Sequence, residues 1–148
     1  FVQALKTLNG GRITIAARSV GIAQAALDEA SEYASNREQF DQRIGDFQAI
    51  QHKLADMDTK TRAARLLMHS AADKKMRGEE FIKEAAQAKL YASEASREVA
   101  NEGIQIHGGY GYTKDFPVER MYRDAKLNEI YEGTSEVLRN TIGQQLLD

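Results

Sequence analysis

The apolar positions of the first 35 residues recur with the period of an α-helix. They fall on two separate stripes, which predicts a long helix that is packed on more than one side. Many of these positions are alanine, which allows neighbouring helices to approach closely. The first stripe contains Leu5, Leu8, Ile15, Ser19, Ile22, Ala26 and Tyr33, and the second contains Ile13, Ala16, Val20, Ala23, Leu27, Ala30 and Ala34.

The rest of the chain alternates apolar-periodic segments with short polar ones. We expect further helices at about 47–76, 80–106 and 118–126, and a last helix capped by Thr134 or Ser135. Glycines and Pro117 mark the intervening loops, and no segment shows the alternation of a β-strand. The prediction is an all-α fold: an antiparallel up-down four-helix bundle of the three long helices and the last one, forming one domain over 1–148.

Composition excludes several classes of protein. The chain has 148 residues, with 20 lysines and arginines, 22 aspartates and glutamates, a formal net charge of −2 and no cysteine. The balanced charge argues against a nucleic-acid binder, and the lack of cysteine excludes disulfides and thiolate metal sites. No apolar run approaches the ~18 residues of a membrane span. Because the helical pattern is already running at Phe1, we expect the chain to be a piece of a longer protein.

The three histidines do not form a metal-binding pattern. A di-iron bundle needs Glu-x-x-His on facing helices, and no glutamate stands three residues before His52, His69 or His107. His52 and Asp56 are one helical turn apart, but such a pair is more often a solvated face. We therefore expect no metal site.

Two loops have compositions that suit a ligand, although local sequence leaves an ordinary structural role equally open. Gly108 and Gly109 follow a helix and would allow an extended ligand close to the backbone, or simply end the helix. The other loop contains Arg37, Gln39, Phe40 and Arg43, and its mixture of planar cation, amide and aromatic ring suits a phosphate and a flat ring system. Gly109-Tyr110-Gly111 is not a dinucleotide fingerprint, because its third glycine is missing and a helix precedes it.

Two charged residues stand out against their surroundings. Arg12 lies among the apolar positions of the first helix, where it needs a partner or a cavity. Glu132 lies in an irregular loop between Tyr131 and Gly133, and a desolvated carboxylate there would suit a general base. The alternatives are a buried ion pair for Arg12 and an acid that complements a helix dipole for Glu132.

Taken together, these residues resemble one family. The segments LNGGRITIAARSVGIAQAALDEASEYASNREQF, FQAIQHKLADM and QIHGGYGYTKDFPVERMYRDAKLNEIYEGTSE are similar to the C-terminal helical domain of acyl-CoA dehydrogenases. These flavoproteins desaturate acyl-CoA thioesters, and the resemblance runs from end to end of the chain. It implies FAD as cofactor, an acyl-CoA substrate, an electron-transfer flavoprotein as electron acceptor and a homotetramer of identical subunits.

The resemblance also implies roles for individual residues. Glu132 matches the base that removes the α-proton, and Gly133 would lie against the substrate. Some relatives carry the base just before the arginine that matches Arg12; here that position is Gly11, which leaves Glu132 as the candidate. The segment that contacts acyl-CoA matches Asn9, Gly10, Gly11 and Arg12.

The residues that match FAD contacts form two groups. One group is expected to reach the cofactor of a neighbouring subunit, and it comprises Arg37, Phe40, Gln48, Gln105, Ile106, His107, Gly108 and Gly109. The other is expected on the same side as the base, and it comprises Thr134, Ser135 and Glu136. Many relatives carry leucine where this chain has His107.

The resemblance also implies an N-terminal helical domain and a middle β-domain, and neither is represented in these 148 residues. The resemblance predicts the base-bearing domain of an FAD-dependent acyl-CoA dehydrogenase for short or medium chains, inactive as an isolated piece. The alternative is a non-catalytic oligomerisation module from a relative with different chemistry. We expect the bacterial cytoplasm as location, or the mitochondrial matrix for a eukaryotic source.

Overall fold

The computed structural model describes the backbone of residues 2–147 and the side chains of residues 8–147. It confirms the all-α prediction. The helices begin and end within two residues of the expected positions. They are α1 (Val2–Asn36), α2 (Gln48–Met76), α3 (Ile82–His107), α4 (Val118–Asn128) and α5 (Ser135–Leu147), with 3₁₀ turns η1 (Ile44–Asp46) and η2 (Gly108–Tyr112).

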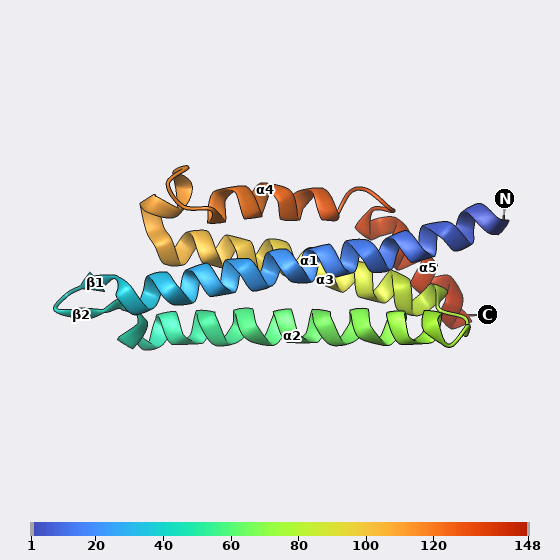
Figure 1. The fold of residues 1–148 in the computed structure, drawn as a ribbon, viewed down its shortest axis with the longest axis horizontal. Coiled ribbons are helices and arrows are strands. Elements are labelled where there is room, and N and C mark those ends of the chain that lie inside the picture. Colours follow the sequence, from blue (N-terminus) through green and yellow to red (C-terminus); the bar gives the residue numbers. More distant parts are fainter. Residues whose placement is uncertain (1, 148) are drawn as a thin grey trace.

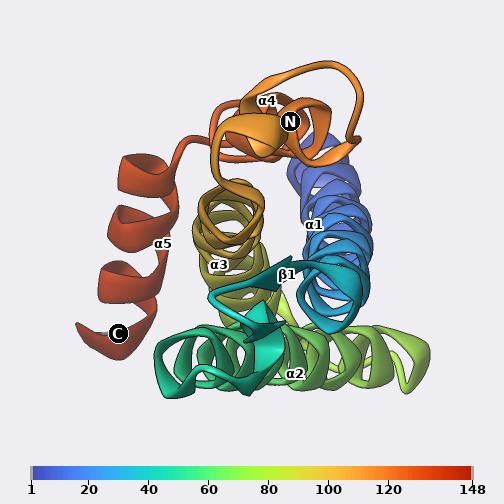
Figure 2. The same cartoon turned by 90° about the vertical axis from the view of Figure 1, so that its left-hand side faces the viewer.

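The first four helices run alternately up and down (Figure 1). Helices α1 and α3 lie side by side, α2 crosses beneath both, and α4 lies over them on the opposite side (Figure 2). The sequence suggested that the last helix would complete the bundle. In the structure, α4 takes the fourth antiparallel position instead. Pro117 and a pair of buried residues, Val118 and Ala125, allow this shorter helix to dock there. Helix α5 packs on the outside of α3, where Arg139 binds Glu94 at 2.8 Å.

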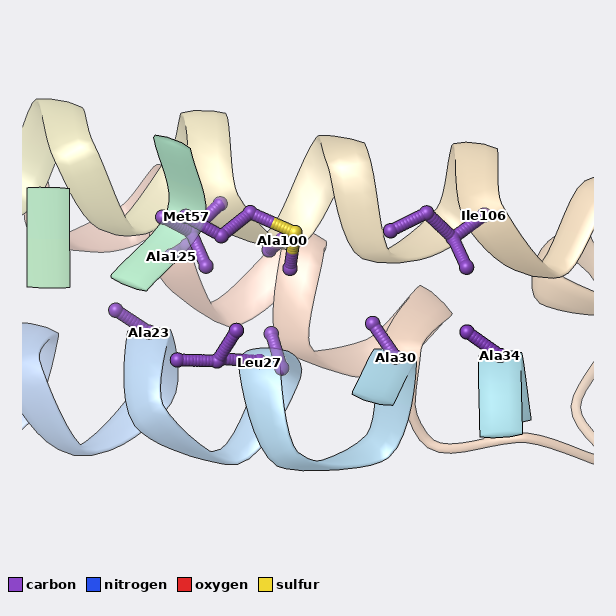
Figure 3. Close-up of a cluster of buried hydrophobic side chains, with 10 residues drawn as sticks. Ala23, Leu27, Ala30, Ala34, Met57, Ala100, Ile106 and Ala125 are labelled. Carbon is purple, nitrogen blue, oxygen red and sulfur yellow. The ribbon is translucent and has the colours of Figure 1, made fainter. Parts of the chain in front are cut away.

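Alanine-rich surfaces bring the helices together along the core. One cluster joins the second half of α1 to α2, α3 and α4, and Figure 3 shows its side chains meeting between the ribbons. A second cluster nearer the start of α1 contains Ile13, Ala16, Val20 and Ala64. The described side chains of both predicted stripes of α1 are buried or half-buried within one chain, which confirms that this helix is packed on more than one side. Leu5 of the first stripe lies outside the described side chains.

The segment between α1 and α2 is a small hairpin rather than a plain loop. Strands β1 (Glu38–Gln39) and β2 (Gln42–Arg43) pair antiparallel, although no strand was expected. Phe40 and Asp41 form the two-residue turn with φ of 55° and 62°. This left-handed pair matches the twist of short hairpins, so turn geometry creates the strands despite their polar sequence.

None of the helices in the described part of the chain is both long and apolar enough to cross a membrane.

Candidate active site

Glu132 lies in the connection between α4 and α5, in a backbone conformation that is unusual for a residue with a side chain. Its φ is 56°, and Gly133 follows with a φ of 100°. The left-handed region crowds the Cβ atom of an ordinary residue, so Glu132 needs outside support to remain there. The side chain is half-buried. Glycine at the next position continues the turn and brings the chain into α5.

The carboxylate of Glu132 lies directly against the backbone of α1 at Gly11. A methyl group built on Gly11 would lie 2.7 Å from Oε2 and 3.0 Å from the carboxyl carbon of Glu132. Any side chain at position 11 would therefore displace the carboxylate. Gly11 and Glu132, which lie near opposite ends of the sequence, are therefore neighbours in the structure.

Arg12 is buried beside this carboxylate. Its Nη1 donates to Oδ1 of Asn9 at 2.9 Å, and its Nη2 lies close to Gly133, since a methyl group on that glycine would be 3.7 Å away. Burial lowers the pKa of Arg12 from its ordinary value, and the negative charge of Glu132 opposes that shift. Its Nε is buried without a protein partner. The predicted group of Asn9, Arg12, Glu132 and Gly133 is thus assembled at one point.

A cleft of about 440 Å³ opens beside Asn9, where the ends of α2 and α3 meet α1. Lys75, Phe81 and Ile82 contribute to its walls. A methyl group on Gly10 would lie 3.1 Å from Nζ of Lys75, so glycine here lets a lysine approach the α1 backbone. Glu79 and Glu80 also line the cleft, so its walls are apolar and of mixed charge, and Asn9 is the lining residue that connects it to the Arg12 group.

Contacts not anticipated from the sequence hold the loop around Glu132. Nζ of the buried Lys89 on α3 donates to the carbonyl oxygen of Gly133 at 2.6 Å. Nη1 of Arg18 donates to the hydroxyl of Tyr131 at 2.7 Å, and that hydroxyl donates to Oδ1 of Asn128. In the sequence, the feature that could have identified Lys89 is its position as a charged residue beside the alanine stripe of the third predicted helix.

The start of α5 presents polar atoms next to Glu132. Thr134 caps the helix, because its Oγ1 accepts from the backbone N–H of Val137 at 3.5 Å. The pKa of the Glu136 carboxyl is lowered by hydrogen bonds from the backbone N–H of Glu136 and from the side chain of Thr134. The hydroxyl of Ser135 is buried without a protein partner. A ligand hydroxyl or phosphate placed here would satisfy it.

The other group of predicted cofactor residues gathers at the far end of the bundle. Arg37 and residues 106–109 line one cleft of about 270 Å³, together with Tyr33 and Tyr110. The guanidinium of Arg37 lies 5.7 Å from the centre of the Tyr110 ring. Gly108 has a φ of 63°, and a methyl group on Gly109 would meet nothing within 4 Å, so the backbone there is open to a ligand.

His107 forms part of the wall of this cleft. Its Nδ1 donates to the carbonyl oxygen of Gly103 at 2.7 Å, and its ring stacks on Tyr33 with centroids 4.2 Å apart. Because Nδ1 carries the proton, Nε2 of the neutral ring is an acceptor, and it is buried without a partner.

Three predicted residues lie around the cleft without lining it. Phe40 projects from the hairpin turn, is 87% exposed, and contacts Phe47 edge-on at 6.3 Å. Gln48 is exposed at the start of α2, one residue after Phe47, and Gln105 is exposed on the last turn of α3. An exposed phenyl ring suits stacking on a flat ligand.

The two regions are far apart. Gly11 and Asn36 lie on the same helix, so at the α-helical rise they are about 38 Å apart. The Glu132 region and the Arg37 region are therefore two separate candidate sites within one chain. Among the described residues, no group of three histidines, aspartates or glutamates could hold a metal ion.

Comparison with known proteins places this geometry in a family. Residues 1–147 match the family described as acyl-CoA dehydrogenase, C-terminal domain. The chain is 54% identical to the 3-(aryl)acrylate reductase of Clostridium sporogenes over 99% of its length and 39% of that protein. It is 52% identical, over 99% of its length and 39% of that protein, to subunit CarC of the caffeyl-CoA reductase–Etf complex of Acetobacterium woodii. The butyryl-CoA dehydrogenase structure from Megasphaera elsdenii superposes with a TM-score of 0.97 at 49% identity, over 98% of this chain and 38% of that one.

The chain belongs to the acyl-CoA dehydrogenase family and corresponds to its C-terminal domain. It spans about two fifths of the length of the relatives it matches.

Proposed function

We propose that this chain is the base-bearing domain of a longer, FAD-dependent acyl-CoA dehydrogenase, and that Glu132 is the catalytic base. The observation that carries the proposal is the placement of the Glu132 carboxylate. It is held against Gly11 and beside the buried Arg12, whose partner Asn9 lines a cleft.

The reaction needs a base on one side of the substrate and a hydride acceptor on the other. Glu132 takes the α-proton of the thioester, the β-hydrogen leaves as hydride, and a carbon–carbon double bond forms between the two carbons. Bound FAD supplies the hydride acceptor, which no side chain can provide. Gly11 supplies the space that keeps the carboxylate close to the α-carbon, and Gly133 allows the substrate near the loop backbone.

Unpartnered polar atoms support binding of FAD by the residues named above. The hydroxyl of Ser135 is such an atom near Glu132, and Nε2 of His107 is another beside the Arg37 cleft. Arg37 supplies a planar cation for a pyrophosphate, and the bare backbone of Gly108 and Gly109 lets a dinucleotide approach. Because the two regions are about 38 Å apart, the Arg37 region of one subunit serves the FAD of another. A homotetramer of identical subunits satisfies this requirement.

The second candidate function is reduction of an α,β-unsaturated thioester by the same site. It is favoured by two of the relatives above, which are reductases of arylacrylate and caffeyl-CoA. In that direction Glu132 delivers the proton to the α-carbon, because a reversible reaction uses the same groups both ways. The butyryl-CoA dehydrogenase similarity favours oxidation of short acyl chains. A purely structural module has no use for a carboxylate held in a left-handed turn beside a buried arginine.

The proposed electron partner follows from the similarity to one of these relatives. One relative is a subunit of a complex with an electron-transfer flavoprotein, and we assign such a flavoprotein as the electron partner of this enzyme. The proposed location is the bacterial cytoplasm.

The test is a substrate panel on the full-length flavoprotein, monitored by bleaching of the flavin absorbance. Saturated short, branched and aryl-substituted acyl-CoAs test oxidation, and the matching enoyl-CoAs added to the reduced enzyme test reduction. Glu132→Gln should retain FAD but lose at least about 10³-fold in the rate of either reaction. Near-normal rates in this variant would contradict the assignment of the base.

A further inference from the structure

Lys89 is a buried cation that the proposed reaction does not use. It lies on α3 among the buried residues Ala85, Ala86, Ala88 and Ala92, and of the side chains that the structure describes it is the largest that is fully buried. Removing an ammonium group from water costs free energy unless hydrogen bonds and charges compensate. A hydrophobic residue of similar length would fill the same space without that cost, so the lysine calls for a specific explanation.

The ammonium of Lys89 reaches out of the helix core to the loop that carries Glu132. Its Nζ donates to the carbonyl oxygen of Gly133 at 2.6 Å. Glu132 and Gly133 have φ of 56° and 100°, a left-handed pair that is unfavourable at the glutamate. The hydrogen bond fixes the peptide immediately after this pair, and it ties the loop to the rigid middle of the bundle.

Charges on the surrounding elements act on the same ammonium. Arg12 of α1 repels it, whereas Glu94 of α3 and Glu129 and Glu132 of the loop attract it. Burial together with Arg12 lowers the pKa of Lys89 to about 8, despite the three carboxylates. At neutral pH the lysine is thus charged, and it donates a charge-assisted hydrogen bond, which is stronger than a neutral one.

We propose that Lys89 is a positioning residue for the base: its hydrogen bond to the Gly133 carbonyl holds the Glu132–Gly133 turn so that the Glu132 carboxylate stays against Gly11. The kinetic consequence rests on the proposed function, whereas the structural consequence does not. Loss of the bond frees the turn to leave the left-handed region and carries the carboxylate away from the reacting carbon. A displacement of about 1 Å is sufficient to slow such a reaction by about 10²-fold.

The test compares Lys89→Met, Lys89→Gln and the control Lys53→Met in the full-length flavoprotein. Methionine fills the buried volume without a donor, whereas glutamine keeps an N–H donor without the charge. Lys53→Met removes a lysine that pairs with Glu102 at the α2–α3 contact. Two readouts are needed: the limiting rate of flavin reduction with butyryl-CoA, and hydrogen exchange of the backbone amides of residues 129–134 without substrate.

We expect Lys89→Met to retain FAD and its affinity for butyryl-CoA. The limiting rate should fall at least tenfold, and exchange in residues 129–134 should rise at least tenfold. Lys89→Gln should recover part of both effects, and Lys53→Met should match the unmodified protein.

Three results would separate the possible failures. Unchanged exchange in Lys89→Met would overturn the proposal. Loss of FAD and helical structure in both Lys89 variants would also overturn it, because it would show a general role in folding. If the unmodified flavoprotein is not reduced by any acyl-CoA, the proposed function fails, while the exchange comparison still decides the role of Lys89.

Discussion

The carboxylate of Glu132 lies directly against the backbone of Gly11, so that a Cβ atom on residue 11 would be only 2.7 Å from Oε2 of Glu132. A contact this short cannot accommodate a side chain without movement of the carboxylate. The identity of residue 11 therefore controls the position of the proposed base, although it has no chemical role of its own.

Gly11→Ala should slow flavin reduction by acyl-CoA about 10²-fold, because the added methyl group pushes the Glu132 carboxylate out of position. The limiting rate in stopped-flow measurements of the full-length enzyme checks this. Gly21→Ala is the matched control on the same helix, where an added methyl group meets nothing within 4 Å. It should keep the full rate and raise stability by about 0.5–1 kcal/mol. Equal rates in the two variants would argue that the Glu132 loop adapts freely.

Arg37→Ala should weaken retention of FAD about 10–100-fold, because a hydrogen bond to a charged group contributes about 1.5–3 kcal/mol. The effect on the reduction rate of enzyme that keeps its flavin should be small, since Glu132 lies in the other region. Flavin content after gel filtration and titration of the apoprotein with FAD measure it. Arg43→Ala is the control on the same hairpin, since this arginine pairs with Asp46 at 3.4 Å on the exposed surface. A similar loss in both variants would point to the hairpin rather than to Arg37.

The 148-residue chain by itself should fold but remain colourless and inactive. Its core is closed within the chain, so we expect a helical circular dichroism spectrum with a cooperative thermal transition. The two proposed FAD-contacting regions are about 38 Å apart, so a single chain offers each cofactor only part of its contacts. Absorbance near the flavin bands after incubation with FAD and gel filtration is the measurement. A yellow preparation that bleaches with an acyl-CoA would contradict this expectation.

The sequence was sufficient for the helices because their apolar periodicity is long and is interrupted by glycines and Pro117. It did not reveal which helix completes the bundle, because α4 is short, with 11 residues, and its docking depends on contacts with both α1 and α3. The hairpin at 38–43 was missed for a different reason. Its strands arise from the left-handed turn at Phe40 and Asp41 and not from alternating polarity.

The sequence likewise predicted only part of the candidate site. Glu132 and Arg12 could be singled out locally, since each is a charge in an unexpected setting. The contact between Glu132 and Gly11 depends on the docking of the α4–α5 loop on α1, which no local pattern encodes. Lys89 was missed because it borders the alanine stripe of its helix, and its burial becomes evident only when α3 meets the Gly133 loop.

The burial of Lys89 should give the folded chain a pH-dependent stability that Lys89→Met lacks. Its pKa is about 8 when folded, against 10.5 for a free lysine side chain. Between these values the unfolded chain holds more protons than the folded one, so the free energy of unfolding rises with pH across this window. Below pH 8 both states are protonated, and the cost of burying the charge is fully present.

Thermal unfolding of the 148-residue chain and its Lys89→Met variant from pH 7 to pH 10 measures this contribution. Relative to Lys89→Met, the unmodified chain should gain up to about 3 kcal/mol as the pH rises, since one pKa unit corresponds to about 1.4 kcal/mol. Loss of the hydrogen bond to Gly133 also changes the stability of Lys89→Met at every pH, so the slope of the difference with pH is the decisive quantity. Lys53→Met controls for loss of a positive charge at a partly exposed pair. Parallel pH profiles for the unmodified chain and Lys89→Met would show that Lys89 keeps its proton equally in both states.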